Sequence, residues 1–199
     1  MPTWTAGPFP IGQRVYLRPP RRTDAERFIA AASASARLHA AWVRAPRTSR
    51  GFGALVDRYA QRCVSPKHAG FLVLRKSDDA LVGVYNFSEI VRGGFQSAYL
   101  GYYAFAPHAG NGLMSEGLAL ALDAAFGVLK LHRVEVNIQP TNERSLALVQ
   151  RLGFAREGFS RRYVKVGGRW RDHVRYAMLA EDWRVHRGPF YRQLRAARR

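Results

Sequence analysis

The sequence has a single cysteine, Cys63, so a disulfide bond within the chain is impossible. Its six histidines are scattered along the chain, and no cysteine–histidine group has the spacing of zinc ligands. We therefore expect neither a disulfide framework nor a metal site. With 199 residues, the chain is long enough to bury a substantial core as one large domain.

Long apolar runs are also lacking. The longest one is interrupted by Asp123 and is too short to cross a bilayer. The first twelve residues, MPTWTAGPFPIG, lack the basic and then apolar pattern of a signal peptide. The sequence therefore predicts a soluble, cytoplasmic protein with no membrane attachment.

Acidic residues are scarce: 14 Asp and Glu stand against 32 Lys and Arg, for a formal net charge of +18. Such a charge favours acidic partners, namely nucleic acid, a ribonucleoprotein or a polyanionic cofactor. A solvated surface in an arginine-rich sequence has the same composition, so both interpretations stay open. We expect one domain over residues 1–185, followed by a basic C-terminal helix or tail over residues 186–199.

The apolar pattern predicts an α/β (α+β) chain. Alternation predicts strands over residues 14–18, 70–74, 80–87, 97–105 and 132–139, and a hairpin over residues 154–166 and 169–179. Helical spacing predicts helices that begin at a Thr23–Glu26 capping box, cover residues 52–64, follow Gly112, cover residues 143–152 and begin again at Glu181. The order is β-αα-βββ-α-β-α-ββ, which gives a mixed sheet of about seven strands with flanking helices.

The helix after Gly112 is almost entirely apolar. Its two acidic residues, Glu116 and Asp123, lie seven positions apart and therefore share one face. A polar stripe this narrow predicts a helix that is buried on most sides.

A glycine turn, Ala109-Gly110-Asn111-Gly112, joins a strand to this helix. A strand, a glycine turn and a helix N-terminus together offer unpaired backbone N–H groups to an anion. An ordinary strand-to-helix turn would use the same glycines, so the turn does not identify a ligand by itself.

The residues after the turn distinguish between three glycine-loop motifs that bind phosphate groups. A P-loop needs Lys and then Ser or Thr where Leu113 and Met114 stand, and a dinucleotide-binding loop needs a third glycine where Ser115 stands. A third alternative is the pyrophosphate loop of the GNAT acyltransferases, Q/R-x-x-G-x-G/A. Gly112 matches that pattern strictly, while Ala109 replaces its Gln or Arg and Met114 replaces its last small residue.

A second segment makes the resemblance specific. Residues 137–145, NIQPTNERS, and residues 152–158, LGFAREG, resemble the N-x-x-S…L-G-F-x-x-E-G signature of GNAT N-terminal acetyltransferases. Residues 168–173, GRWRDH, resemble their closing G-x-W-x-D-H. The similarity covers roughly residues 10 to 185 and is to the RimJ/RimL-like ribosomal-protein alanine N-acetyltransferases.

This resemblance implies a GNAT fold and transfer of an acetyl group from acetyl-CoA to a protein N-terminal α-amine by direct attack in a ternary complex. It implies a ribosomal protein with an N-terminal alanine as the acceptor, and the basic surface suggests docking on a ribosome or on RNA. Two alternatives stay open. One is a GNAT enzyme that acetylates a small amine, such as an antibiotic or a polyamine, and the other is a non-catalytic acyl-CoA-binding module.

The resemblance also implies the cofactor contacts. Backbone N–H groups from Gly110 to Ser115 would hold the pyrophosphate, so the loss of the family's basic residue at position 109 is tolerable. A bulge in the preceding strand would free backbone groups for the thioester, although its aromatic residues fit plain core packing as well. The expected contacts with acetyl-CoA are Tyr103, Ala104, Phe105, His108, Ala109, Gly110, Asn111, Gly112, Leu113, Met114, Ser115, Asn137, Asn142 and Ser145.

The general acid departs from the pattern of many GNAT enzymes, because Val149 stands where they place a tyrosine. In the RimJ/RimL-like branch, the residue at Ser145 is the proposed proton donor to the thiolate. The same serine also fits a local role in satisfying the backbone of a first helical turn. Asn142 fits a catalytic or cofactor contact, a helix cap, or both.

The general base is less defined, because residues 96–105 contain no carboxylate. Glu89 at the end of the preceding strand is the first candidate, followed by Asp172, Glu135 and His173. A water chain fits as well, since a peptide α-amine has a pKa of about 8 and needs little assistance.

Overall fold

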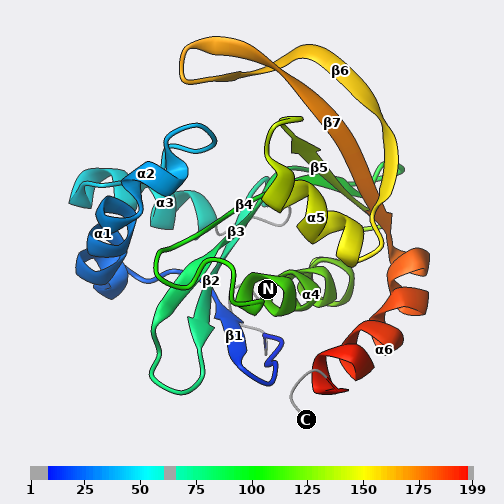
Figure 1. Ribbon diagram of the computed structural model, residues 1–199, viewed down its shortest axis with the longest axis horizontal. Helices are drawn as coiled ribbons and strands as arrows, with labels where there is room; N and C mark the ends of the chain where they lie inside the picture. Colours follow the sequence, from blue (N-terminus) through cyan, green and yellow to red (C-terminus); the bar gives the residue numbers. More distant parts are fainter. Residues whose placement is uncertain (1–8, 61–65, 197–199) are drawn as a thin grey trace.

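The computed structural model describes residues 9–60 and 66–196 (Figure 1). Cys63, and the end of the helix expected over residues 52–64, lie outside the described residues. Within them, no helix combines the length and the apolar character needed to cross a membrane.

The centre of the molecule is a seven-stranded sheet with the order β1-β2-β3-β4-β5-β7-β6. All neighbouring strands are antiparallel except β4 and β5, which run parallel, so the predicted mixed sheet is confirmed. The strands are β1 (Val15–Arg18), β2 (Ala69–Arg75), β3 (Leu81–Val91), β4 (Ser97–Ala104), β5 (Arg133–Ile138), β6 (Ala155–Val166) and β7 (Arg169–Leu179).

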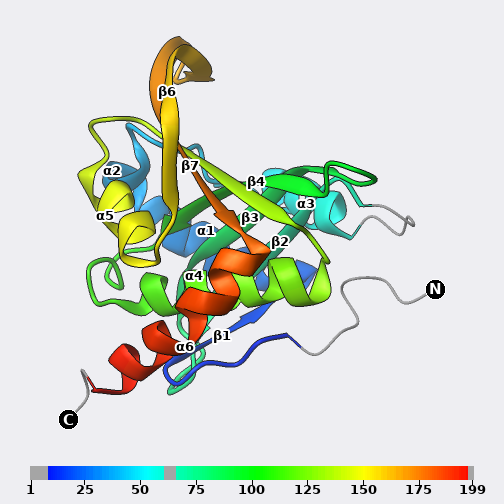
Figure 2. The same ribbon diagram turned by 90° about the vertical axis from the view of Figure 1, so that its right-hand side faces the viewer.

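Helices cover both faces of this sheet (Figures 1 and 2). Strand β2 shows why: Phe71 and Val73 belong to one core cluster, while Leu72 and Leu74 belong to the other. A strand whose successive side chains are all buried must be covered twice. The helices are α1 (Ala25–Ala34), α2 (Ala36–His39) and α3 (Ser49–Tyr59) on one face, and α4 (Leu113–Asp123), α5 (Glu143–Arg151) and α6 (Ala180–Ala196) on the other.

The expected capping box at the start of α1 is wrong. Residues Arg22–Asp24 form a 3-10 turn, and the Asp24 side chain makes no cap hydrogen bond to α1. Instead, its carboxylate accepts from Arg18 at 2.6 and 2.7 Å, from the backbone N–H of Arg21 at 2.8 Å, and from Arg27. The cap position of α1 is therefore Asp24 and not Thr23, and two guanidinium groups hold the Asp24 carboxylate away from the helix backbone.

Helix α4 is buried on most sides, as predicted, but its polar stripe does not face solvent. Glu116 is fully buried and accepts from the Arg14 backbone N–H at 2.8 Å and from Arg14 Nε at 3.1 Å. The stripe therefore anchors α4 to its neighbours through charge-assisted hydrogen bonds.

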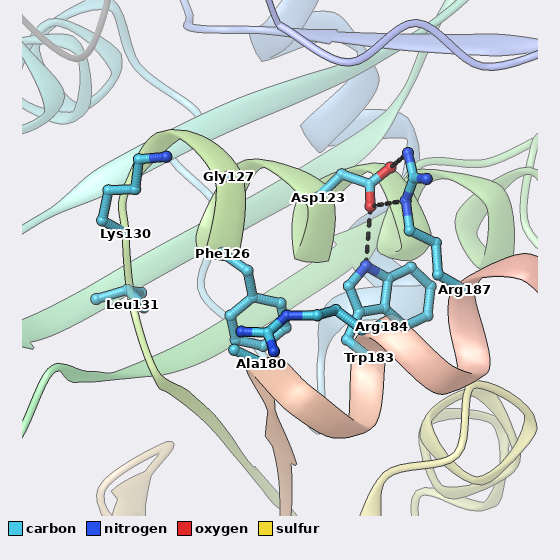
Figure 3. Close-up of a pocket in the computed structure, with 9 residues that line it drawn as sticks. All are labelled: Asp123, Phe126, Gly127, Lys130, Leu131, Ala180, Trp183, Arg184 and Arg187. Carbon is cyan, nitrogen blue, oxygen red and sulfur yellow. Dashed lines mark hydrogen bonds and ion pairs between the residues drawn. The ribbon is translucent and has the colours of Figure 1, made fainter.

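The other acid of the stripe, Asp123, anchors α6. Its carboxylate accepts from Trp183 Nε1 at 2.8 Å and from Arg187 Nε at 2.7 Å (Figure 3). It also accepts from the Tyr191 hydroxyl at 2.9 Å. Helix α6 is continuous across the domain boundary expected at residue 185, and it buries Phe190 against the core. The described part of the expected tail is therefore a docked helix.

We predict that Asp24 makes the protein sensitive to acid. Burial by itself raises the pKa of Asp24, but the hydrogen bonds from Arg18, Arg21 and Arg27 outweigh it and lower the pKa to about 2. A carboxyl whose pKa is lower when folded stabilises the protein above its unfolded pKa of about 3.9 and loses that contribution as the pH falls towards 2. Urea titrations should show that the wild type loses about 2 kcal/mol more unfolding free energy than Asp24→Asn between pH 6 and pH 2.

The matched control is Asp57→Asn, which removes an exposed carboxylate that pairs with Arg22. Equal acid sensitivity of the wild type and Asp24→Asn would contradict the prediction.

Candidate active site

The candidate site lies where β4 and β5 part. The two parallel strands pair only from Ser97 to Tyr99 on β4 and from Arg133 to Glu135 on β5. Beyond these residues β4 continues to pair with β3, and β5 with β7. A gap therefore opens inside the sheet, bordered by backbone that has no strand partner on that side.

Backbone direction along β4 determines which groups face the gap. The Phe105 N–H donates to Val82 O on the β3 side at 2.8 Å, so the groups of Tyr102 and Ala104 point the other way. Ala104 O accepts from His39 Nε2 at 2.8 Å, which leaves the Ala104 N–H directed into the gap. The expected bulge is not found here, since β4 pairs with β3 without a register shift from Tyr99 to Ala104.

The glycine turn follows β4 and opens α4, with Gly112 as the residue that precedes the helix. Gly110 and Gly112 have φ of 88° and 71°, in the left-handed region that favours glycine. The first backbone bond across the turn runs from Glu116 N–H to Gly112 O, so the N–H groups of residues 113–115 have no acceptor within the helix. The helix N-terminus therefore presents donors and positive potential to an anion.

A basic side chain that the sequence analysis did not assign to this loop reaches it from α5. Arg151 Nη1 donates to Ser115 Oγ at 3.1 Å, and both residues line the same cavity. Arg151 thus supplies a guanidinium group beside the loop, which carries no basic side chain at Ala109. Its position was hidden in the sequence because 36 residues separate the two partners.

A cavity of about 850 Å³ fills the gap and joins these features. This volume lies in the range of small-molecule and cofactor sites. Of the expected residues, its walls include Tyr103, Ala104, Ala109, Gly110, Gly112, Met114, Ser115, Asn137, Asn142 and Ser145. The fold therefore brings most of the expected contacts together.

Four expected contacts do not line the cavity. Phe105 is fully buried in the core cluster under α1 and α3, and Leu113 is buried beneath the loop. Asn111 uses its carbonyl to accept from Arg14 at 3.2 Å. His108 stands before the loop, outside the cavity walls.

The hydroxyl groups of Ser145 and Tyr102 lie within hydrogen-bond distance of each other on the cavity wall. Ser145 Oγ lies 2.6 Å from the Tyr102 hydroxyl, and Ser145 also receives a backbone cap, since its N–H donates to Asn142 Oδ1 at 3.3 Å. Burial raises the pKa of Tyr102, although its bond to Ser145 acts in the opposite direction. Tyr102 therefore remains a neutral donor. This role of Tyr102 was not predicted from the sequence, because aromatic residues on a strand also fit core packing.

The candidate bases lie in different places. Glu89 is exposed with φ of 49° and does not line the cavity. Glu135 pairs with Arg133 at 2.9 Å, and Asp172 accepts from the Arg162 backbone N–H at 2.7 Å. Both carboxylates are therefore already engaged, and neither lines the cavity.

His173 is the candidate base that does line the cavity. Only 4% of the residue is exposed, and its Nδ1 lies 3.0 Å from Arg171 O. Because a carbonyl only accepts, Nδ1 carries the proton and Nε2 of the neutral ring keeps its lone pair. Burial lowers the pKa of His173 below its usual value, which keeps the ring neutral at pH 7.

A second cavity, of about 500 Å³, lies between the end of α4 and α6 (Figure 3). Its walls include Asp123, Phe126, Lys130 and Trp183 and none of the expected site residues. The carboxylate of Asp123 is engaged by α6, so this cavity belongs to the packing of that helix.

A gap between parallel strands beside a helix N-terminus that can hold an anion fits an acyltransferase that uses a coenzyme A thioester. The acetyltransferase (GNAT) domain family matches residues 14–155, and the chain belongs to this family. It is a RimJ-like member, and acetyl-CoA is the acyl donor.

Individual relatives are consistent with this assignment. The probable N-acetyltransferase YjcK of Bacillus subtilis is 34% identical over 86% of this chain and 97% of that protein. The [ribosomal protein uS5]-alanine N-acetyltransferase of Escherichia coli is 43% identical, but over only 52% of this chain and 53% of that enzyme. The spermidine N(1)-acetyltransferase of E. coli is 25% identical over 87% and 90%.

Among solved structures, Mycobacterium smegmatis RimJ in complex with CoA-disulfide superposes with a TM-score of 0.78. It is 27% identical, and the match covers 84% of this chain and 83% of that one.

The site fits this cofactor. Asn137 Oδ1, on the cavity wall, is buried and has no hydrogen-bond partner within the described residues. A buried acceptor of this kind needs a donor, and the amide groups of a pantetheine arm supply donors.

We expect Arg151→Gln to weaken acetyl-CoA binding about five- to tenfold in calorimetry, because a partly exposed, charge-assisted contact to the pyrophosphate is lost. Acetyl-pantetheine lacks the pyrophosphate and should bind the wild type and the variant equally. Arg156→Gln, an exposed substitution on β6, is the control. An equal loss with acetyl-pantetheine would place Arg151 elsewhere along the cofactor.

Proposed function

We propose that the protein transfers the acetyl group of acetyl-CoA to the α-amine of a protein N-terminus by direct attack in a ternary complex. The proposed acceptor is a ribosomal protein with an N-terminal alanine. The observation that carries the proposal is the wall of the cavity on the acceptor side, which is apolar and nearly free of carboxylates. The name of the E. coli relative, which acts on ribosomal protein uS5, supports the acceptor class.

The proposed acceptor side of the cavity lies between α2 with the residues that follow it and the β6–β7 hairpin. Helix α2 and the residues after it contribute Leu38, Trp42 and Val43, and the hairpin contributes Val166. These apolar surfaces suit a small first side chain such as alanine, with the extended peptide leaving between the two elements.

A polyamine acceptor is the second candidate, supported by the spermidine-acetylating relative. A polycation needs acidic partners, and the described cavity wall has one carboxylate, Glu143, beside the guanidinium groups of Arg144 and Arg151. The charge of this wall therefore favours an acceptor with a single amine over a polyamine.

Acetyl-CoA supplies the acetyl group as an activated thioester. The N–H groups of residues 113–115, together with Arg151, bind the pyrophosphate. The Ala104 N–H is directed into the gap and stabilises negative charge on the thioester carbonyl oxygen. The Asn137 and Asn142 side chains orient the pantetheine arm.

The paired hydroxyl groups serve the leaving thiolate. When the C–S bond breaks, Ser145 donates its proton to the sulfur. The neutral Tyr102 hydroxyl, 2.6 Å away, keeps its proton and stabilises the serine oxygen by a hydrogen bond until solvent reprotonates it, and the proton that leaves the ammonium balances the one that the thiolate gains. The pair takes the role of the tyrosine that many GNAT enzymes carry at position 149. In this chain that position holds Val149, whose side chain is fully buried in the core.

His173 is the proposed base. Its unprotonated Nε2 accepts a proton from the acceptor ammonium, while the Nδ1 bond to Arg171 O fixes the tautomer. Glu89, the first candidate from the sequence, is exposed and away from the cavity wall, so the mechanism assigns it no step.

The first test measures thiol release from acetyl-CoA against peptides that begin with Ala, Ser or Met, beside spermidine and an aminoglycoside. We expect release with the Ala peptide, a fall in kcat of about 10²-fold for Ser145→Ala, and unchanged acetyl-CoA affinity. Ser77→Ala, in the β2–β3 turn, is the control. Release with spermidine alone would establish the second candidate. Tight acetyl-CoA binding without any turnover would establish a binding module.

A second test addresses the base. We expect His173→Gln to lower kcat about 10²-fold at pH 7 and much less at pH 9, where an acceptor amine with a pKa of about 8 is already deprotonated. The exposed His132→Gln is the control, because His132 pairs with Glu181 away from the cavity. A loss of equal size at both pH values would give His173 a structural role only.

A further inference from the structure

The hairpin of β6 and β7 extends beyond the sheet as an arm. It curves above β5 and α5 towards α2 in Figure 1 and stands clear of the helices in Figure 2. Val166 and His173 of the hairpin line the cavity. Its turn, Gly167–Gly168, comes close to Arg44 after α2, since a Cβ built on Gly167 would lie 3.9 Å from Arg44 Nη2. The arm therefore lies at the acceptor entrance, with most of its outer half exposed.

The arm concentrates positive charge. Between Ala155 and Leu179 it carries seven Arg and Lys residues against two acidic ones. Both acids are already engaged: Glu157 pairs with Arg133, and Asp172 accepts from the Arg162 backbone N–H. Among the described residues, no carboxylate pairs with the basic side chains near the tip, which are Arg161, Arg162, Lys165, Arg169 and Arg171.

Large aromatic side chains are exposed among these charges. Trp170 is 60% exposed, Phe159 48% and Tyr163 37%. Trp170 lies directly opposite Lys165 across the hairpin, so an indole and an ammonium group share one face. Cationic side chains that bind phosphates, next to aromatic faces that stack on bases, are the combination that binds single-stranded nucleic acid.

We propose that this arm is a binding site for single-stranded RNA. The charge disfavours the alternative that the arm pairs with a second copy of the chain, because two basic arms on molecules of formal charge +18 repel each other. The choice of RNA over DNA rests on the proposed function, since a ribosomal acceptor is surrounded by RNA. An arm that holds RNA beside the cavity entrance raises the local concentration of such an acceptor.

The test is fluorescence anisotropy with a short labelled single-stranded RNA of mixed sequence, over a series of KCl concentrations and without acetyl-CoA or acceptor. We expect the triple variant Arg161→Gln, Lys165→Gln, Arg169→Gln to reduce the slope of log K against log salt by about 2, which corresponds to three lost phosphate contacts. Trp170→Ala should weaken binding about tenfold with little change in slope, because a stacked base is lost but no charge.

The matched control is Arg184→Gln, Arg192→Gln, Arg195→Gln on α6, which removes the same charge from exposed positions away from the arm. It should retain nearly wild-type affinity. Equal losses in both triple variants, no effect of Trp170→Ala, tighter binding of single-stranded DNA, or no binding by the wild type would each overturn the proposal.

The RNA-binding assay and the acetyl-transfer assay are independent, so failure of one proposal can be distinguished from failure of the other. An arm that binds RNA on an enzyme that acetylates no peptide would refute the proposed function alone. Peptide acetylation without RNA binding would refute the arm proposal alone.

Discussion

The separation of β4 from β5 is the constraint on which the site depends. Paired strands satisfy each other's backbone groups, and these two strands stop pairing after Tyr99. The sheet stays continuous because β3 holds the rest of β4 and β7 holds the rest of β5. A cavity bordered by backbone donors that have no strand partner on that side therefore forms inside a continuous sheet. Side chains from α4 and α5 form the remaining wall of the cavity.

Local signals predicted the elements well, and contacts distant in sequence were missed. The alternation of the strands, the glycine turn before α4 and the Asn142 cap were all visible within a few residues. The Tyr102–Ser145 pair joins residues 43 positions apart, and the His39 contact with Ala104 joins residues 65 apart. Such contacts depend on how the elements pack. The local signal itself failed at the start of α1, where the Thr23–Glu26 pattern predicted a capping box. The helix begins one residue later, after Asp24, whose carboxylate is held by Arg18 and Arg27.

The scarcity of acidic residues acts in two ways. Inside the fold, Asp24, Glu116 and Asp123 each bind a guanidinium group and fasten a helix to its neighbours. Their charge is therefore largely neutralised within the protein. The remaining arginines stand on the surface with little compensation, so the exterior that partners meet is strongly positive. This positive exterior attracts an acidic cofactor and, in our proposal, an RNA.

The contact between α2 and β4 links the two substrates. Helix α2 lines the part of the cavity that we propose for the acceptor, and its His39 holds the carbonyl of Ala104, whose N–H faces the gap. Ser35, just before α2, accepts from the Ala106 N–H at 2.9 Å and fixes the next outward-facing group. An acceptor that shifts this helix must also rotate the peptide group that meets the thioester. In the proposed mechanism, such a shift would couple the binding of the two substrates, and each would then alter the affinity for the other by the same factor.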